Sequence, residues 1–131
     1  MVFVRPIAGK KLIGTAGRHR VITDRKAEDG GTDEGCTSGE LLLLAIASCA
    51  TGSVRNALAA RALPNDEISV DVDLAPPKRD GARDAIAITV RLPQAVLDAG
   101  EALVIEAATA GGVVSRLKRG SDIDVRCLPL E

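Results

Sequence analysis

The chain has 131 residues, of which 46% are hydrophobic and 27% are charged, and its formal net charge is −1. This balance gives no electrostatic reason to expect a nucleic acid or an anionic membrane surface as partner, and a single aromatic residue disfavours the base-stacking platforms of single-strand binders. Length and composition are typical of one globular domain over residues 1–131, with a core of Leu, Ile, Val and Ala.

The N-terminal third predicts short strands followed by a loop. Residues 2–7 and 11–23 are rich in Val, Ile and Thr and are punctuated by glycines, which is typical of strands joined by turns. The apolar residues here come before the lysines, the reverse of a secretory signal, so we expect a cytoplasmic protein. An acidic, glycine-rich loop follows over residues 24–39.

A long helix is predicted from Ser38 towards Leu63. Thr37 or Ser38 can cap its start, and Glu40 has the spacing of a capping box after Thr37. Pro64 stops the helix. Because its first half is apolar on nearly all sides, we expect it to be buried all round. No uncharged apolar run reaches the roughly 18 residues of a membrane span, so we expect a core helix and no membrane.

The next segments predict a hairpin and two helices. Alternating apolar residues over 68–74 and 86–92 predict an antiparallel hairpin around a long loop. A helix is expected from about Asp98, with Asp98 as its cap and Glu101 at capping-box spacing, and the glycines at 111 and 112 break it. One or two further helical turns then end at Gly120.

A final strand is predicted over residues 122–128, where Ile123, Val125 and Cys127 share the apolar phase. This pattern places Cys127 on a buried face. The order of strands, long helix, hairpin, helices and strand predicts an α+β fold.

Three cysteines, at positions 36, 49 and 127, are the residues that could carry chemistry. An odd count without a leader argues against a disulfide framework. No CxxC pair accompanies them and His19 is the sole histidine, so we expect no metal site and no cofactor. The chain also lacks the GxSxG elbow of serine hydrolases and the glycine spacings of phosphate-binding loops.

Each cysteine has a structural interpretation beside a chemical one. Cys127 would pack in the core, Cys36 would be an incidental loop residue, and Cys49 would be a small hydrophobe on the buried helix. Alternatively, a thiol held by a rigid helix is a nucleophile where its surroundings favour the thiolate. On the residues alone, both interpretations of Cys49 stay open.

Residues 17–61 resemble the OsmC/Ohr family of osmotically induced and organic hydroperoxide resistance proteins, and in particular its OsmC-like branch. The segments that carry the resemblance are residues 22–24, the glycines at 30, 31 and 35, Glu40-Leu41-Leu42, Ser48-Cys49, residues 113–120 and the predicted last strand. The resemblance implies an α+β fold of antiparallel sheets around a long central helix. It also implies an intertwined homodimer with two sites at the interface.

A mechanism is implied as well. Cys49 matches the family cysteine that attacks a peroxide oxygen and becomes a sulfenic acid; a second cysteine then forms a disulfide that an external dithiol reduces. Arg18 matches the arginine that stabilises the thiolate, with Arg20 as a competitor. The family's charge network includes an acidic residue whose position is occupied by Gly39 in this chain, and Glu40 follows one position later.

The resolving cysteine of the family is missing, because Gly112 stands in its place. Cys36 is separated from Cys49 by a mostly helical interval, so a disulfide within one chain would need the helix start to unwind. Cys127 would have to leave its sheet face or already lie against the helix. An external thiol is the remaining way to resolve an oxidised Cys49.

Three hypotheses follow for the function. The first is a thiol-dependent reductase of organic hydroperoxides, a one-cysteine peroxidase that uses Cys49 and an external thiol reductant. The second is a catalytically inactive dimer that binds a small hydrophobic ligand at its interface. The third is a structural role for the homodimer itself. The reactivity of Cys49 towards hydroperoxide separates the first hypothesis from the other two.

Overall fold

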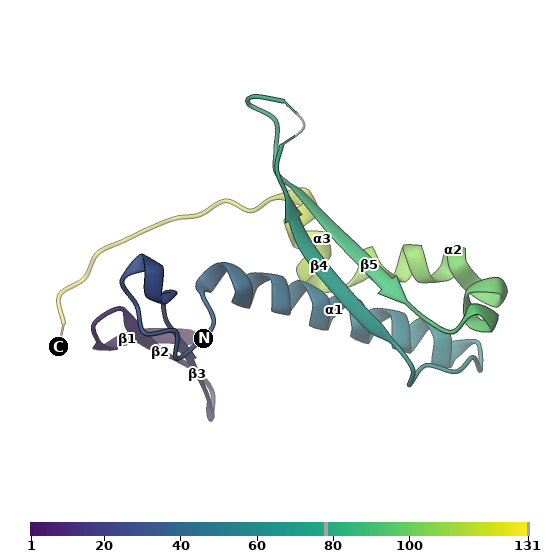
Figure 1. Ribbon diagram of the computed structural model, residues 1–131, viewed down its shortest axis with the longest axis horizontal. Helices are drawn as coiled ribbons and strands as arrows, with labels where there is room; N and C mark the ends of the chain where they lie inside the picture. Colours follow the sequence, from purple (N-terminus) through teal and green to yellow (C-terminus); the bar gives the residue numbers. More distant parts are fainter. Residues whose placement is uncertain (78, 131) are drawn as a thin grey trace. The chain divides into compact units, whose positions relative to one another are not determined.

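The computed structural model describes residues 1–77 and 79–130, which form two compact units, Met1–Ala45 and Ile46–Glu131 (Figure 1). Three strands and a short 3₁₀ turn belong to the first unit, and a hairpin and two helices belong to the second. The α+β class with antiparallel sheets is confirmed. The single domain over residues 1–131 stays a prediction.

The first unit contains a three-stranded antiparallel sheet in the order β1-β2-β3. Its strands are β1 (Val2–Ala8), β2 (Lys11–Ala16) and β3 (His19–Thr23), as the Val- and Ile-rich pattern predicts. Two residues, Gly17 and Arg18, join β2 to β3, and the φ of +60° at Gly17 suits a tight hairpin turn.

This sheet has no apolar core of its own. Among the described residues of the first unit, Asp24 alone is buried. Every residue of β1 is exposed, including Phe3 and Ile7. A small sheet needs an apolar face packed on something else to be stable in water, so this unit depends on contacts beyond its own residues.

The long helix α1 (Ser38–Ala60) begins with the predicted capping box. The hydroxyl of Thr37 accepts from the Glu40 N–H at 3.1 Å, and a Glu40 carboxylate oxygen accepts from the Thr37 N–H at 2.8 Å. The helix ends three residues before the predicted Leu63, in a turn where Ala62 has a φ of 55°.

The prediction that the first half of α1 is buried all round is wrong for the single chain. The buried residues form one stripe at a spacing of four, which is one face of a helix: Ile46, Ala50, Val54 and Leu58. Leu41, Leu42 and Leu44 are exposed. The pattern predicted burial correctly only where this chain itself supplies a covering element.

By length and composition alone, α1 is able to cross a membrane, and 22% of its most apolar 18-residue window is buried in the chain. The sequence pattern excluded a span on the stricter criterion of an uncharged run. A core helix of an assembly passes the same length test, so the composition of α1 assigns it to neither surrounding.

The second unit packs helices on a hairpin. Strands β4 (Ser69–Ala75) and β5 (Ala85–Arg91) pair antiparallel, as predicted, and Lys78 of their loop lies outside the described residues. The core joins the residues of α1 to α2 and to the inner face of the hairpin; its buried members are Ala50, Val54, Leu58, Val96, Val104, Ala107 and Ala108. Small side chains at most of these positions permit close packing of the helices.

Helix α2 (Gln94–Ala110) begins four residues before the predicted start at Asp98. The Asp98 side chain is therefore no cap; one of its carboxylate oxygens accepts from Gln94 Nε2 at 2.7 Å. The capping-box spacing misplaced the start because the helix continues across a kink at Gly100, whose φ and ψ are −162° and 32°. The break at the glycine pair and α3 (Gly112–Arg119), which ends before Gly120, are as predicted.

The predicted final strand is absent: among the described residues after Arg119, none lies in a strand or helix (yellow in Figure 1). Ile123 and Val125 are 86% and 85% exposed, and Cys127 is exposed rather than buried. The residues do alternate as in a strand, but a strand forms only by exchanging backbone hydrogen bonds with a neighbouring strand. This segment has no such neighbour within the described chain.

Candidate functional site

Cys49 lies in the middle of α1, half-buried, where the helix meets the junction between α2 and α3. Gly111, at this junction, is in close contact with the Cys49 side chain. A Cβ atom on Gly111 would lie 2.4 Å from Cys49 Sγ, which is much nearer than a carbon and a sulfur can approach without a bond. The sulfur therefore packs directly against the backbone of Gly111.

Ser53 completes this contact. It follows Cys49 by one helical turn, so both side chains project from the same face of α1. The same Cβ position on Gly111 would lie 2.7 Å from Ser53 Oγ. A thiol and a hydroxyl thus converge on one glycine, and no sequence pattern marks Ser53 or Gly111 as part of the site.

The glycine that contacts Cys49 is Gly111 and not Gly112. A Cβ atom on Gly112 would meet only Arg116 Nη1, at 3.8 Å, within 4 Å. The family resemblance predicts that a second thiol would stand at position 112, but in this chain the neighbour of the Cys49 sulfur is one residue earlier. The helical phase at the start of α3 decides between the two positions, and no sequence pattern fixed that phase.

The other two cysteines have different surroundings. Cys36 is half-buried, and its backbone is fixed: its carbonyl oxygen accepts from the Asp24 N–H at 3.2 Å, and it forms a bridge with Thr23. Cys127 is exposed in the segment without regular structure. All three cysteines are free thiols in the structure.

Arg18 occupies the tip of the β2–β3 turn in the first unit and is exposed. Among the described residues of that unit it makes no ion pair. Arg20 is exposed on β3, opposite Thr15. Within the first unit, neither guanidinium group forms an ion pair, and neither is paired with Glu40.

Glu40 has a local role at the start of α1. Besides the capping box with Thr37, its second carboxylate oxygen lies 3.1 Å from Lys26 Nζ. The hydrogen bond from the Thr37 N–H, followed by that from Lys26, lowers the pKa of Glu40. In this structure the carboxylate is engaged at the helix start. Its part in a charge network at the thiol stays a prediction.

Asp24 organises the loop before α1, a role that was not predicted from the sequence. It is 4% exposed, and its carboxylate accepts hydrogen bonds from the Thr32 hydroxyl at 2.7 Å and from the backbone N–H groups of Arg25, Thr32 and Glu34. The Thr32 hydroxyl contributes most to lowering its pKa to about 2. An Asp directly after a strand and before a glycine-rich loop was the available signal.

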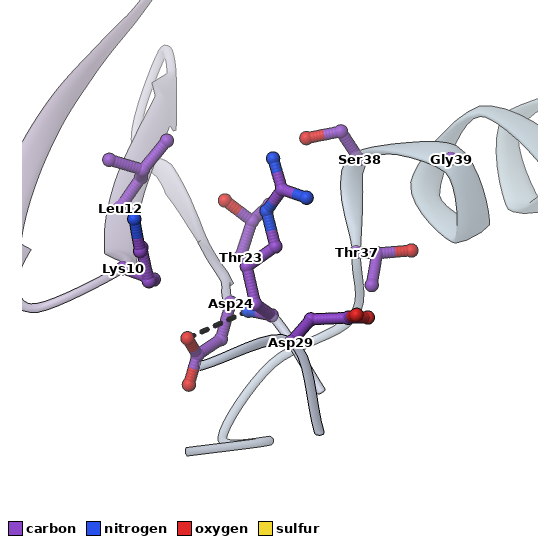
Figure 2. Close-up of a pocket in the computed structure, with 9 residues that line it drawn as sticks. Lys10, Leu12, Thr23, Asp24, Asp29, Thr37, Ser38 and Gly39 are labelled. Carbon is purple, nitrogen blue, oxygen red and sulfur yellow. Dashed lines mark hydrogen bonds between the residues drawn. The ribbon is translucent and has the colours of Figure 1, made fainter. Parts of the chain in front are cut away.

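A pocket of about 310 Å³ lies within the first unit beside this loop. Figure 2 shows its wall, which combines Asp24 and Asp29 with Lys10 and with Thr37 and Ser38 from the start of α1. A wall rich in charged and hydroxyl groups suits a polar ligand rather than an apolar one. Among residues 1–77 and 79–130, no three His, Cys, Asp or Glu side chains lie together as a metal site requires.

Comparison with known proteins gives one family and several solved structures. The OsmC family model, described as OsmC-like protein, matches residues 31–126. An OsmC like protein from Mycoplasma pneumoniae has a TM-score of 0.65 at 10% identity, with 90% of this chain and 86% of that chain covered. No curated protein sequence matches.

Two further structures are similar in fold. The organic hydroperoxide resistance protein OsmC from Legionella pneumophila has a TM-score of 0.59 at 15% identity, with 90% of this chain and 89% of that chain covered. A protein from Vibrio cholerae assigned to organic hydroperoxide resistance, with captopril bound in one of its active sites, has a TM-score of 0.62 at 14% identity, over 90% and 84%. At these identities the similarity shows a shared fold.

Proposed function

The chain belongs to the family of OsmC-like proteins, and on that premise we propose that it reduces organic hydroperoxides at the thiol of Cys49. The observation that carries this proposal is the position of Cys49: its half-buried sulfur sits on a rigid helix beside Ser53 and against Gly111. Relatives of this fold include redox and organic hydroperoxide resistance proteins, which supports a redox role.

The proposed reaction has two stages. The Cys49 thiolate attacks the terminal oxygen of the hydroperoxide; an S–O bond forms, the O–O bond breaks, and the organic fragment leaves as an alcohol after taking a proton. An external thiol then attacks the sulfenic sulfur and releases water, and a second thiol frees Cys49. With Gly111 against the sulfur, no side chain of the α2–α3 junction offers a second thiol at that contact.

We place Arg18 beside the thiolate, with Arg20 as its competitor, because the resemblance assigns an arginine to that role. A guanidinium favours the charged form of a thiol. Its exposed position on a two-residue turn, without an ion pair in its own unit, leaves Arg18 available. We keep Glu40 as the acidic member of the charge network, although its carboxylate also caps α1.

The functional form we propose is a homodimer. The first unit buries no apolar residue among those described, and the leucines at 41, 42 and 44 of α1 are exposed. Exposed apolar surface of this extent is typical of an interface. A second copy of the chain covers these surfaces in our proposal, rather than a lipid bilayer, and it offers the C-terminal segment a strand to pair with.

The alternative is a catalytically inactive dimer that binds a small hydrophobic ligand. It is supported by the missing family cysteine and by the exposed apolar side chains that a dimer would gather. The Vibrio cholerae relative holds captopril in an active site, so a small molecule can occupy the corresponding region in that protein.

Reaction with cumene hydroperoxide tests the proposal. We expect intact-mass analysis to show addition of one oxygen at Cys49, trapped by dimedone, and turnover that requires an added dithiol. Cys49→Ser is the control and should gain no oxygen. A wild-type protein that instead loses two hydrogens would assign the resolving thiol to Cys36 or Cys127. No change under excess hydroperoxide would favour the binding alternative.

A further inference from the structure

The hydroxyl of Ser53 is the polar group nearest the Gly111 contact after the thiol itself. The Cβ position on Gly111 lies 2.4 Å from Cys49 Sγ and 2.7 Å from Ser53 Oγ. The two side chains are one turn apart on α1, and both are half-buried. The backbone of Gly111 covers one side of the sulfur, and a reactant oxygen that reaches the sulfur at the edge of this contact also comes near the Ser53 hydroxyl.

The neighbouring hydroxyl of Thr51 behaves differently. Thr51 Oγ1 donates to the Ala47 carbonyl oxygen at 2.8 Å, the usual bond of a helical hydroxyl to the preceding turn. Within the described part of the chain, no such hydrogen bond engages Ser53 Oγ. Its O–H is thus available to an oxygen atom at the thiol.

We propose that Ser53 is a catalytic residue, whose hydroxyl donates a hydrogen bond to the oxygen that leaves when Cys49 attacks an organic hydroperoxide; this role rests on the proposed function. Two electrons move from sulfur to the O–O bond, the terminal oxygen joins the sulfur as a sulfenic acid, and the organic oxygen departs as an alkoxide that takes up a proton. A donor aimed at this developing negative charge lowers the barrier to attack.

The expected size of the effect follows from the charge on the acceptor. A hydrogen bond to a charged group contributes about 1.5–3 kcal/mol, which corresponds to roughly a tenfold to hundredfold change in rate. Because Ser53 is half-buried rather than enclosed, we expect the lower end, about tenfold.

The test compares two reactions of Cys49 in a Cys36→Ser, Cys127→Ser background. Alkylation by iodoacetamide uses the same thiolate, but its leaving group is iodide. In the reaction with cumene hydroperoxide the leaving group is an alkoxide, whose oxygen can accept the hydrogen bond. We expect Ser53→Ala to slow the peroxide reaction about tenfold and to change alkylation by less than about twofold. Ser53→Thr keeps the hydroxyl and should restore the peroxide rate. Ser48→Ala, which removes an exposed hydroxyl next to Cys49, is the matched control and should react like the parent.

The outcomes separate the two proposals. Equal slowing of both reactions by Ser53→Ala would give Ser53 a structural role and refute the catalytic one, as would an unchanged peroxide rate. A parent protein whose Cys49 reacts with cumene hydroperoxide no faster than free cysteine would remove the proposed function, and the role of Ser53 with it.

Discussion

Replacing Gly111 by alanine would test the contact on which the site is built. The new Cβ would lie 2.4 Å from Cys49 Sγ and 2.7 Å from Ser53 Oγ, whereas ordinary contacts begin near 3.5 Å. The neighbours must therefore move by about 1 Å or α3 must withdraw from α1. The backbone at Gly111, with φ −65° and ψ 154°, suits any residue, so the cost arises from the collision alone.

The expected penalty is that of overpacking a filled site, about 1–3 kcal/mol. Gly112→Ala is the matched control, because its Cβ would meet only Arg116 Nη1, at an ordinary 3.8 Å. A glycine-to-alanine change at a position without strain stabilises a protein by about 0.4–1 kcal/mol. Because this gain is common to both variants, they should differ in free energy of unfolding by the overpacking penalty alone, roughly 1–3 kcal/mol, with Gly111→Ala the less stable.

Urea unfolding at one fixed protein concentration measures this difference, since an assembly's stability depends on concentration. With a denaturant slope of about 2 kcal/mol per molar urea, the two midpoints should lie about 1 M apart. In a Cys49→Ala background the closest collision is gone, so the penalty of Gly111→Ala should shrink. Equal stability of the two glycine variants, or a penalty that Cys49→Ala leaves unchanged, would refute the packing described for the sulfur.

Cys49→Ser should leave the protein folded, with a loss of about 1–3 kcal/mol for an unpaired hydroxyl; circular dichroism and sedimentation check this, and global unfolding would mark Cys49 as a core residue first. Gly111→Cys should form a disulfide with Cys49 on oxidation more readily than Gly112→Cys, since only the first places its Cβ beside the sulfur; intact mass after mild oxidant decides the order. Asp24 stabilises the loop of residues 24–37 while it is ionised: its pKa is lowered to about 2 from 3.8, so the contribution is complete above about pH 4 and is lost as the pH falls towards 2. Hydrogen exchange should show the loop opening over that range in the wild type, and opening already at neutral pH in Asp24→Asn. Wild-type protein should sediment as a dimer at micromolar concentration, and Leu42→Asp, on the exposed face of α1, should shift it towards monomer or unfold it; a folded wild-type monomer would contradict the proposed assembly.

Local patterns predicted those elements whose partners lie nearby in the chain. The alternation over residues 68–74 and 86–92 predicted β4 and β5 to within a residue, because one face of this hairpin packs on the helices of its own unit. The capping box at Thr37 and Glu40 was equally readable, since its hydrogen bonds span three residues.

The same patterns failed for segments that have no covering element nearby in the same chain. The C-terminal segment has the alternation of a strand, but hydrophobic periodicity says only which face would be buried, not whether a neighbouring strand exists. Leu41 and Leu44 were expected inside for the same reason and lie exposed.

The candidate site was predictable in part. Cys49 followed from the family resemblance, and its place on α1 from the helical pattern. Its neighbours could not be predicted from the sequence, because the contact with Gly111 depends on how α3 packs on α1. A shift of one residue in that packing would bring Gly112 to the sulfur instead. Ser53 could have been found from its spacing of four from Cys49, had the face of α1 that meets the junction been known.

The absence of an apolar core in the first unit has a consequence for how the protein is made. A ribosome delivers the N-terminal residues first, so β1, with Val2, Phe3 and Val4 exposed, emerges before any residue of the second unit's core. Until that core and a covering surface exist, this apolar edge strand is free to pair with the wrong chain. The early segment is therefore the one that chaperones would need to shield, and slow synthesis or overproduction should cause aggregation through β1 rather than through the later hairpin.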